Sequence, residues 1–385
     1  MIIDKIKLRN WKNFRDAEVN LRERVYVIGP NASGKSNFLD VIRFLRDIAK
    51  TEGGGFQKAV KDRGGIKKLR SLAARKDPSV LVEVELADDA DSPPKWKYSL
   101  EFKNEGSGLR RTMVSKEIVL DLRTGKTLVE RPSTEDEADT DRLTQTSLEQ
   151  ISDNQSFREI ADFFGSATYL HLVPQLLKHS EQLGGYKLEN DPFGQGFLER
   201  VATTVERTRN SRLKRIGEAL RICVPNMQDL RFERDEATGR PHLEARFEHW
   251  RPGVGWQRED QFSDGTLRLL GIMWNLLDGD SVLLLEEPEL SLNEDIVGRI
   301  HGLIWNMQRA AKHRRQVFIT THSNALLSDK SIDPREVLRL EPSNNGTSIF
   351  EATLEEKKLI SSGYSVAEVQ LQKAKPKSVD QLMLF

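Results

Sequence analysis

The chain has 385 residues, and its 59 Lys and Arg residues balance its 59 Asp and Glu residues, so the formal net charge is zero. A nucleic-acid-binding surface would therefore be a local patch and not the whole molecule. The single cysteine, Cys223, excludes an internal disulfide framework and a thiolate zinc cluster. No signal-peptide pattern opens the sequence and no apolar run is long enough to span a bilayer, which predicts a cytoplasmic protein with no membrane partner.

The first elements in chain order form a strand–turn–helix unit. Residues 2–8 alternate apolar and polar side chains, and residues 25–28 form a short apolar run, so both segments are predicted to be strands. Residues 37–49 have apolar side chains at helical spacing. A glycine-rich turn lies between the second strand and this helix, which is the context that a phosphate-binding loop requires.

That turn has the P-loop pattern of glycine, four residues, glycine, lysine and serine. Its backbone N–H groups and the positive end of the helix would bind phosphate oxygens. Lys35 would contact the β- and γ-phosphates, and the Ser36 hydroxyl would bind Mg²⁺. A chance glycine-rich turn is the alternative, and the flanking strand and helix argue against it. The predicted ATP-binding residues are Gly29, Pro30, Asn31, Ala32, Ser33, Gly34, Lys35, Ser36 and Asn37.

Positive charge is concentrated in residues 51–76. This stretch could contact a phosphate backbone, but a solvated helix face or a docking surface for a partner protein explains it equally, and interleaved aromatic residues are missing. The candidate DNA- or partner-binding residues are Lys58, Lys61, Arg63, Lys67, Lys68 and Arg70. A second basic cluster is Arg200, Arg207, Arg209, Arg212, Lys214 and Arg215.

The middle of the chain has weaker signals. Two strands are predicted at 79–86 and 96–103, and a hairpin at 229–249. The acidic, polar segment 131–159 is expected to be an exposed or partly disordered loop. Residues 197–222 are expected to form one helix, because apolar residues, Val205 among them, follow a helical stripe.

The C-terminal half contains two further chemical motifs. After a helix at about 266–277, the apolar strand 281–285 ends in the adjacent carboxylates Glu286 and Glu287. At the carboxyl end of a buried parallel strand these acids would hold Mg²⁺ and activate water, respectively. After a helix at about 294–311, the strand 316–320 leads to His322.

The segment Gln261, Phe262, Ser263, Asp264, Gly265 and Thr266 resembles the signature of ABC-type ATPases, more closely the variant of OLD-family and RecF/SMC-like proteins. Ser263 would equally serve as a helix N-cap. The resemblance implies an α/β fold: an ABC-type P-loop NTPase head with a mixed sheet flanked by helices. It also implies that Ser263, Asp264 and Gly265 cap the γ-phosphate bound by a second copy, and that Glu287 and His322 are catalytic.

The resemblance places the head in residues 1–75 and 256–345, with an inserted α+β lobe at 76–255 and a C-terminal extension and tail at 346–385. Two positions depart from the family pattern. Glu286 stands where an aspartate usually contacts the metal, and Asn293 stands where relatives often carry histidine. The magnesium-sensing glutamine expected after the first helix has Gln57 as its only nearby candidate.

The resemblance also implies a role. OLD-family proteins usually carry a TOPRIM nuclease domain after the ATPase, and the segment after His322 is too short for one. We therefore expect an ATPase that uses ATP and Mg²⁺, forms a homodimer and acts as a DNA-linked sensor or regulator of a separately encoded effector, a nuclease by analogy, in antiphage defence. The alternative is an ATP-locked scaffold in DNA repair or replication.

The last residues resemble the peptide by which bacterial proteins dock on the replication sliding clamp. Gln381, Leu382, Leu384 and Phe385 follow a Lys- and Pro-containing linker, and apolar anchors on a tether suit a groove. A tail folded onto its own core is the alternative.

Overall fold

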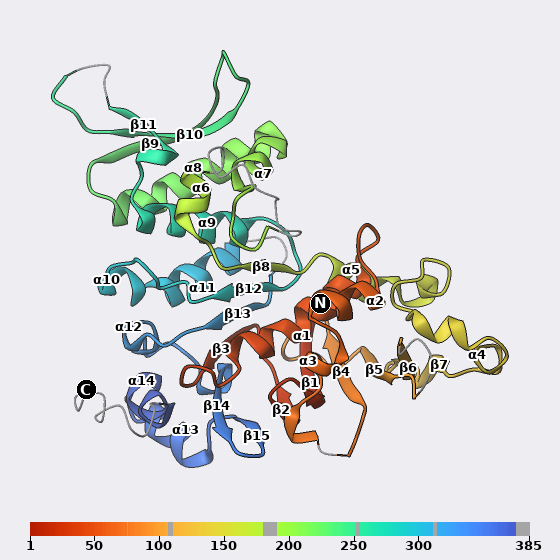
Figure 1. Cartoon of the computed structure of the whole chain (residues 1–385). Helices are drawn as coiled ribbons and strands as arrows, with labels where there is room; N and C mark the ends of the chain where they lie inside the picture. The colour runs from red at the N-terminus through yellow and green to blue at the C-terminus, as the bar shows by residue number, and fades with distance from the viewer. Residues whose placement is uncertain (75, 107–110, 180–190, 252–254, 311–313, 375–385) are drawn as a thin grey trace, which may run out of the picture.

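The computed structural model describes residues 1–74, 76–106, 111–179, 191–251, 255–310 and 314–374. Within these ranges the strands form two six-stranded sheets and one three-stranded sheet, with helices between and around them (Figure 1). The predicted clamp-binding residues 381–385 lie outside the described residues.

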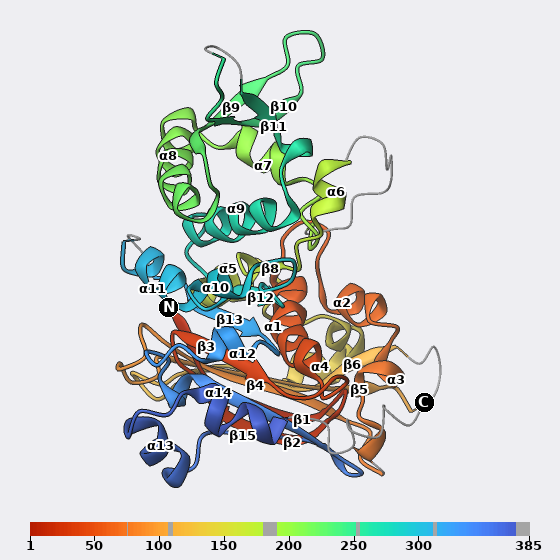
Figure 2. The same cartoon turned by 90° about the vertical axis from the view of Figure 1, so that its left-hand side faces the viewer.

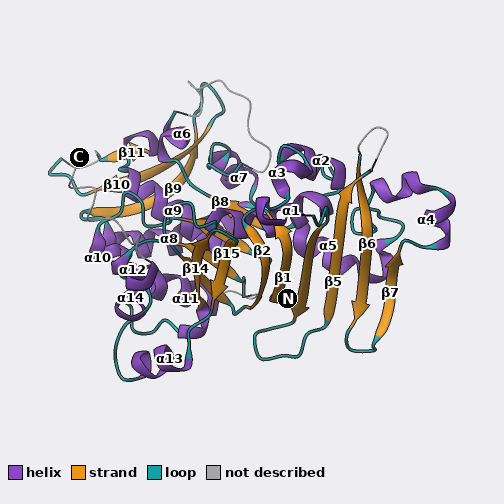
Figure 3. Ribbon diagram, turned by 60° about the horizontal axis from the view of Figure 1, so that its bottom comes forward, coloured by secondary structure: helices purple, strands orange, loops and turns teal. Residues whose placement is uncertain are grey.

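The N-terminal strand begins an antiparallel sheet. Its strand order is β2-β1-β4-β5-β6-β7, and Figure 3 shows these strands side by side. Alternate side chains of β4 (Val80, Val82, Val84 and Leu86) are fully buried, as expected of a sheet that packs one face on a core. The bounds are β1 Ile2–Trp11, β2 Phe14–Asn20, β4 Val80–Ala87, β5 Trp96–Asn104, β6 Thr112–Asp121 and β7 Lys126–Arg131.

The central sheet has the order β15-β14-β3-β13-β12-β8. Strands β14, β3, β13, β12 and β8 run parallel, and β15 pairs antiparallel with β14. The inner parts of the parallel strands are mostly apolar because both faces of the sheet are covered. The bounds are β3 Arg24–Ile28, β8 Thr168–Leu170, β12 Leu283–Glu286, β13 Val317–Thr320, β14 Val337–Ser343 and β15 Gly346–Phe350.

Two hydrophobic clusters cover the two faces of the central sheet. Leu284 and Phe318 belong to the cluster that includes α1 (Lys35–Ala49) and the antiparallel sheet. Leu283 and Ile319 belong to the cluster that includes α9 (Asp264–Leu277). Helices α1 and α9 therefore lie on opposite sides of the sheet (Figure 2).

The remaining helices surround these layers. None of the helices in the described ranges combines the length and hydropathy needed to cross a bilayer. Their bounds are α2 Phe56–Asp62, α3 Ile66–Leu69, α4 Thr134–Ala138, α5 Arg158–Gly165, α6 Pro174–Lys178, α7 Phe197–Thr203, α8 Glu206–Cys223, α10 Glu294–Val297, α11 Ile300–Ala310, α12 Asn324–Leu327, α13 Leu354–Ser361 and α14 Val366–Val369.

The segment 76–255 differs from the predicted single lobe. Strands β4 to β7 extend the sheet that β1 and β2 begin, and β8 joins the central sheet. A separate α+β unit forms only later in the segment, where α7 and α8 pack beside the sheet β11-β10-β9 (Figure 1). These strands are β9 Met227–Arg234, β10 Pro241–Phe247 and β11 Trp256–Arg258.

The segment 131–159, expected to be an exposed or partly disordered loop, is mostly exposed but contains the helix α4 and the start of α5 and is anchored by buried side chains. Arg131 forms ion pairs with Glu117 and Asp136, and both carboxylate side chains are fully buried. Leu148 and Phe157 add fully buried apolar side chains. The exposed polar residues of the segment thus surround a buried ionic network that holds it on the antiparallel sheet.

The expected helix over 197–222 is two helices, α7 and α8, so the prediction of one helix is wrong. The hydroxyls of Thr203 and Thr204 both donate to the carbonyl of Arg200, and such side-chain bonds compete with helix continuation. Val205, assigned to the apolar stripe, is 72% exposed at the break. The predicted helix over 294–311 is likewise divided into α10 and α11.

Candidate nucleotide-binding site

Three neighbouring parallel strands bring the predicted site residues to one edge of the central sheet. The phosphate loop follows β3, the acids Glu286 and Glu287 follow β12, and His322 follows β13. Because β3 pairs with β13 and β13 pairs with β12, all in parallel, their carboxyl ends meet at the same edge. Ligands bind at this edge in open α/β sheets.

The phosphate loop has the conformation that its glycines predict. Gly34 has φ 101° and precedes the first turn of α1, and a Cβ there would lie 2.0 Å from Nδ2 of Asn13. The Lys35 side chain is 7% exposed, and its Nζ donates to the carbonyls of Gly29 (3.1 Å) and Pro30 (3.2 Å). The helix N-terminus and the lysine thus provide an anion site of the P-loop kind.

The first acid lies against the predicted Mg²⁺-binding hydroxyl. The Ser36 hydroxyl donates to one oxygen of Glu286, and the Tyr169 hydroxyl donates to the other. Burial, together with the charge of Glu286, raises the pKa of Tyr169, so the phenol remains a hydrogen-bond donor at neutral pH. A hydroxyl beside a carboxylate is the hard oxygen donor set that Mg²⁺ prefers, so these residues fit the ion.

The second acid lies beside the histidine. Glu287 Oε1 is 3.7 Å from Nε2 of His322, and Glu287 occupies the left-handed region with φ 45°. Burial lowers the pKa of His322, the charge of Lys35 lowers it further, and Glu287 opposes both. A neutral imidazole and an adjacent carboxylate can orient a water molecule and accept a proton.

The predicted signature forms a turn at the start of α9. Exposed Ser263 is the N-cap, and its Oγ accepts from the N–H of Thr266 (3.2 Å). Asp264 accepts from Nζ of Lys178 (2.8 Å) and from the amide of Gln175. A Cβ on Gly265 would lie 2.9 Å from the carbonyl of Ser291, so glycine permits close approach of the loop after Glu287.

This turn makes no ion pair or hydrogen bond with the phosphate loop of its own chain in the described ranges. The two features lie at the starts of α9 and α1, on opposite sides of the central sheet (Figure 2). The turn is consequently available to a second molecule.

Gln57 lies away from the acids. It is on α2, which follows the far end of α1, and its amide donates to the carbonyls of Thr112 (2.8 Å) and Thr144 (2.7 Å). Strand β8 ends at Leu170, which pairs with Leu285, and the residue after it, His171, donates its N–H to the carbonyl of Pro192 (2.8 Å).

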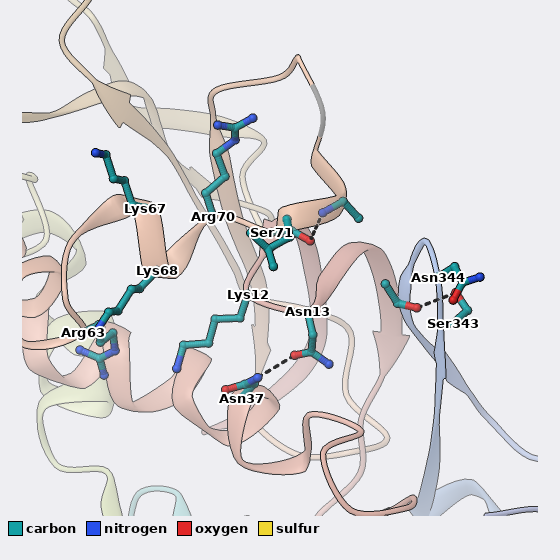
Figure 4. Close-up of a pocket in the computed structure, with 13 residues that line it drawn as sticks. Lys12, Asn13, Asn37, Arg63, Lys67, Lys68, Arg70, Ser71, Ser343 and Asn344 are labelled. Atoms are coloured by element: carbon teal, nitrogen blue, oxygen red, sulfur yellow. Dashed lines mark hydrogen bonds between the residues drawn. The ribbon is translucent and has the colours of Figure 1, made fainter. Parts of the chain in front are cut away.

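A basic cavity of about 730 Å³ adjoins the start of α1. Lys12, Asn13, Asn37 and the tip of the β14–β15 hairpin line one part of it, and the segment 63–73 lines the other (Figure 4). The side chain of Asn37 donates to that of Asn13 (2.8 Å), which itself donates to the carbonyl of Ser33 in the phosphate loop. The cavity is therefore connected to the phosphate loop through side-chain amides.

The predicted basic residues divide into two groups. Lys58 pairs with Asp62, and Arg63 pairs with Asp40 and Asp47 of α1, so these cations are partly neutralised within the chain. The others differ. Lys67, Lys68 and Arg70 line the basic cavity, and Lys61 is exposed.

Residues 25–328 match the AAA_21 family, whose description is "AAA domain, putative AbiEii toxin, Type IV TA system". The chain belongs to the AAA_21 family. No curated protein matches this AAA_21 chain by sequence.

Solved structures similar to this AAA_21 chain include heads of SMC proteins. An SMC head bound to the C-winged helix domain of ScpA shares 15% identity at a TM-score of 0.56, over 92% of this chain and 99% of that one. An SMC head with an extended coiled coil, bound to the C-terminal domain of ScpA from Pyrococcus furiosus, shares 13% identity at a TM-score of 0.51, over 94% and 98%. The predicted ABC-type, SMC-like head fold is confirmed. The narrower resemblance to OLD-family proteins stays a prediction.

Sequence reasoning missed the site residues contributed by β8 and α6 of this AAA_21 chain. Tyr169 contacts Glu286, and Gln175 and Lys178 contact Asp264. Strand β8 has only three residues, which is too short for a periodic signal. The apolar residues around Tyr169 were the one available hint.

Proposed function

We propose that this AAA_21 chain is an Mg²⁺-dependent ATP hydrolase whose complete active sites form between two copies of the chain. The observation that carries the proposal is the meeting of Lys35, Glu287 and His322 at one sheet edge, while Ser263 is exposed at the start of α9. A triphosphate bound by one copy would be capped by the signature turn of the other.

The chemistry follows from the charges at this edge. Lys35 and the N-terminus of α1 would bind the β- and γ-phosphates, and Mg²⁺ held by Ser36 and Glu286 would neutralise phosphate charge. Glu287 would accept a proton from the water that attacks the γ-phosphorus as the bond to the β–γ bridging oxygen breaks. The products are ADP and phosphate.

The nucleoside would extend away from these acids. The γ-phosphate end belongs at Glu287 and His322, so the opposite end of the nucleotide would pass Asn37 and enter the basic cavity beside Lys12 and Asn13. The amides there offer both donors and acceptors, which suits a ribose and a base.

Mixing two inactive variants tests the shared site. Lys35→Ala removes the phosphate-binding cation, and Ser263→Arg fills the signature turn, so each variant alone should be inactive. In an equimolar mixture, half of the randomly assorted dimers contain one complete site. We therefore expect about one quarter of the wild-type rate.

A mixture that stays inactive while both variants fold and exchange subunits would contradict the shared site. Glu287→Gln is the companion variant, because it should bind ATP and dimerise without turnover. Light scattering with ATP measures the dimer, and phosphate release measures the rate. A Glu287→Gln variant that hydrolyses ATP at the wild-type rate would remove this carboxylate from the mechanism.

We further propose that ATP binding gates a separately encoded effector in response to nucleic acid, in a defence role. The family description names a toxin of a toxin–antitoxin system. Lys67 and Lys68, which form no ion pair within the described ranges, are exposed on the part of the cavity that segment 63–73 lines, opposite the part beside Lys12 and Asn13 that is assigned to the nucleoside. Lys67→Glu/Lys68→Glu should weaken DNA binding and its salt dependence, with half-buried Lys357→Glu and exposed Lys358→Glu together on α13 as the matched control. Equal DNA affinity of both double variants would contradict the DNA part, and native co-purification would test the effector.

A further inference from the structure

A third carboxylate, Glu289, follows the predicted metal-binding acid Glu286 and the predicted catalytic acid Glu287 in the same loop. Its Oε1 accepts two hydrogen bonds from the turn after β13: one from the hydroxyl of Thr321 (2.7 Å) and one from the backbone N–H of His322 (3.1 Å). The carboxylate therefore holds the backbone of the residue whose ring lies beside Glu287.

The direction of the Thr321 hydrogen bond is fixed. Its Oγ1 accepts from the N–H of Ser323 (2.9 Å), and its hydroxyl hydrogen is free to point only at Glu289. Ser323 is in turn the N-cap of α12. One carboxylate oxygen thus organises the whole turn from Thr321 to Ser323.

The same turn is connected to the second acid. The N–H of Glu287 donates to the carbonyl (3.1 Å) and to the hydroxyl (3.2 Å) of Thr320. Two segments, the loop after β12 and the turn after β13, are therefore joined at both Glu287 and Glu289. Their connection sets the 3.7 Å separation between Glu287 and His322.

Glu289 is poorly placed to be the proton acceptor itself. Its Oε1 already accepts two bonds, and its Oε2 is buried with no hydrogen-bond partner. The side-chain carboxylate of Glu287 accepts no hydrogen bond from a described residue and is only partly buried, so it remains open to water. This division favours Glu287 as the base and a structural use of Glu289.

A buried cation of the signature helix acts on the same carboxylates. Arg268 of α9 is 5% exposed, and its Nε has no hydrogen-bond partner in the described chain. The charges of Asp264, Glu289 and Glu287 act on its guanidinium. Arg268 is thus a buried cation on the helix that begins with the signature turn.

We propose that Glu289 is a positioning residue for ATP hydrolysis: it fixes the His322 turn against Glu287. The inference rests on the proposed ATPase function and assigns Glu289 no contact with the nucleotide.

The test compares Glu289→Ala with Glu289→Gln. The amide oxygen of glutamine can accept both bonds, so Glu289→Gln should keep kcat within about 3-fold of wild type. Glu289→Ala should lower kcat by roughly 10- to 100-fold with KM for ATP changed less than about 3-fold, because the geometry and not nucleotide binding is lost. Glu355→Ala, which removes an exposed acid of α13, is the matched control and should match wild type.

Two further measurements keep the inference falsifiable. Hydrogen exchange at the His322 amide should be at least about 10-fold faster in Glu289→Ala than in Glu355→Ala, with or without ATP. If Glu289→Ala does not fold, Thr321→Val removes one of the two bonds and should lower kcat on its own. Wild-type kcat in Glu289→Ala, or equal losses in the alanine and glutamine variants, would overturn the proposal. Failure of the proposed function would appear differently, as a wild-type rate no higher than that of Glu287→Gln.

Discussion

Replacing Arg315 with methionine should destabilise the whole head. Arg315 is 2% exposed and follows α11 at the approach to β13. Its guanidinium joins the end of α9 to the starts of β8 and β12. The acceptors are the carbonyls of Asn275, Asp278, Ser281 and Val282 and the hydroxyl of Thr168.

The magnitude follows from these five acceptors. Burial lowers the pKa of Arg315 to about 10, so the group is still charged at neutral pH and the hydrogen bonds offset its desolvation. Each buried acceptor left without a donor costs about 1–3 kcal/mol. Removing the buried guanidinium also removes its desolvation cost, which offsets part of this loss. Breaking such a network typically lowers the free energy of unfolding by about 3–5 kcal/mol in total.

Urea unfolding of Arg315→Met measures this loss. Arg309→Met is the control, because exposed Arg309 lies over the ring of Trp305 at 4.5 Å and should contribute less than about 1 kcal/mol. A free-energy difference below about 1 kcal/mol between the two variants would refute the reasoning. It would mean that other donors reach the carbonyls at the end of α9.

Three further outcomes are expected. Burial raises the pKa of Glu336 from 4.5 to about 7, so the folded state binds this proton more tightly than the unfolded state does. The protonated carboxyl therefore stabilises the fold by at most roughly 3 kcal/mol, and this contribution is lost as the pH rises from about 4.5 through 7. The free energy of unfolding of Glu336→Gln, measured against pH, should lack this dependence. Gly34→Ala should abolish ATP binding measured by calorimetry, because φ is 101° and the Cβ would overlap Asn13, and normal affinity would contradict the loop geometry. Gly265→Ala should keep ATP binding but lower ATP-dependent dimerisation measured by light scattering, because its Cβ would lie 2.9 Å from the carbonyl of Ser291. Dimerisation at the wild-type level would show that the loop at Ser291 can move to accommodate the added methyl group.

The parts of the fold that could be predicted have local signals. The phosphate loop lies between a strand and a helix that each follow from hydrophobic periodicity. The strands before Glu286 and before His322 are continuous apolar runs, which indicate parallel strands covered on both faces. The motifs were each predicted at the carboxyl end of a strand, where ligands bind in open α/β sheets, so the location of the site was predictable although the order of the strands was not.

The remaining parts depend on partners distant in sequence. Glu117 and Arg131 lie on neighbouring strands and are buried together, and composition alone assigns such charges to solvent. Strand β8 is defined by pairing with β12, more than 100 residues later. The contacts of Glu289 likewise require β12 and β13 to be placed side by side, which no local pattern specifies.

The placement of β3 has a consequence for synthesis on the ribosome. Its two neighbours in the central sheet are β13 and β14, which begin at Val317 and Val337. Strand β3, which precedes the phosphate loop, is synthesised early. Neither of its two edges can form its hydrogen bonds to a neighbouring strand until most of the polypeptide has been synthesised. Nascent chains halted before Val317 should therefore be unable to retain ATP, and the unpaired β3 is the segment that a chaperone would need to shield.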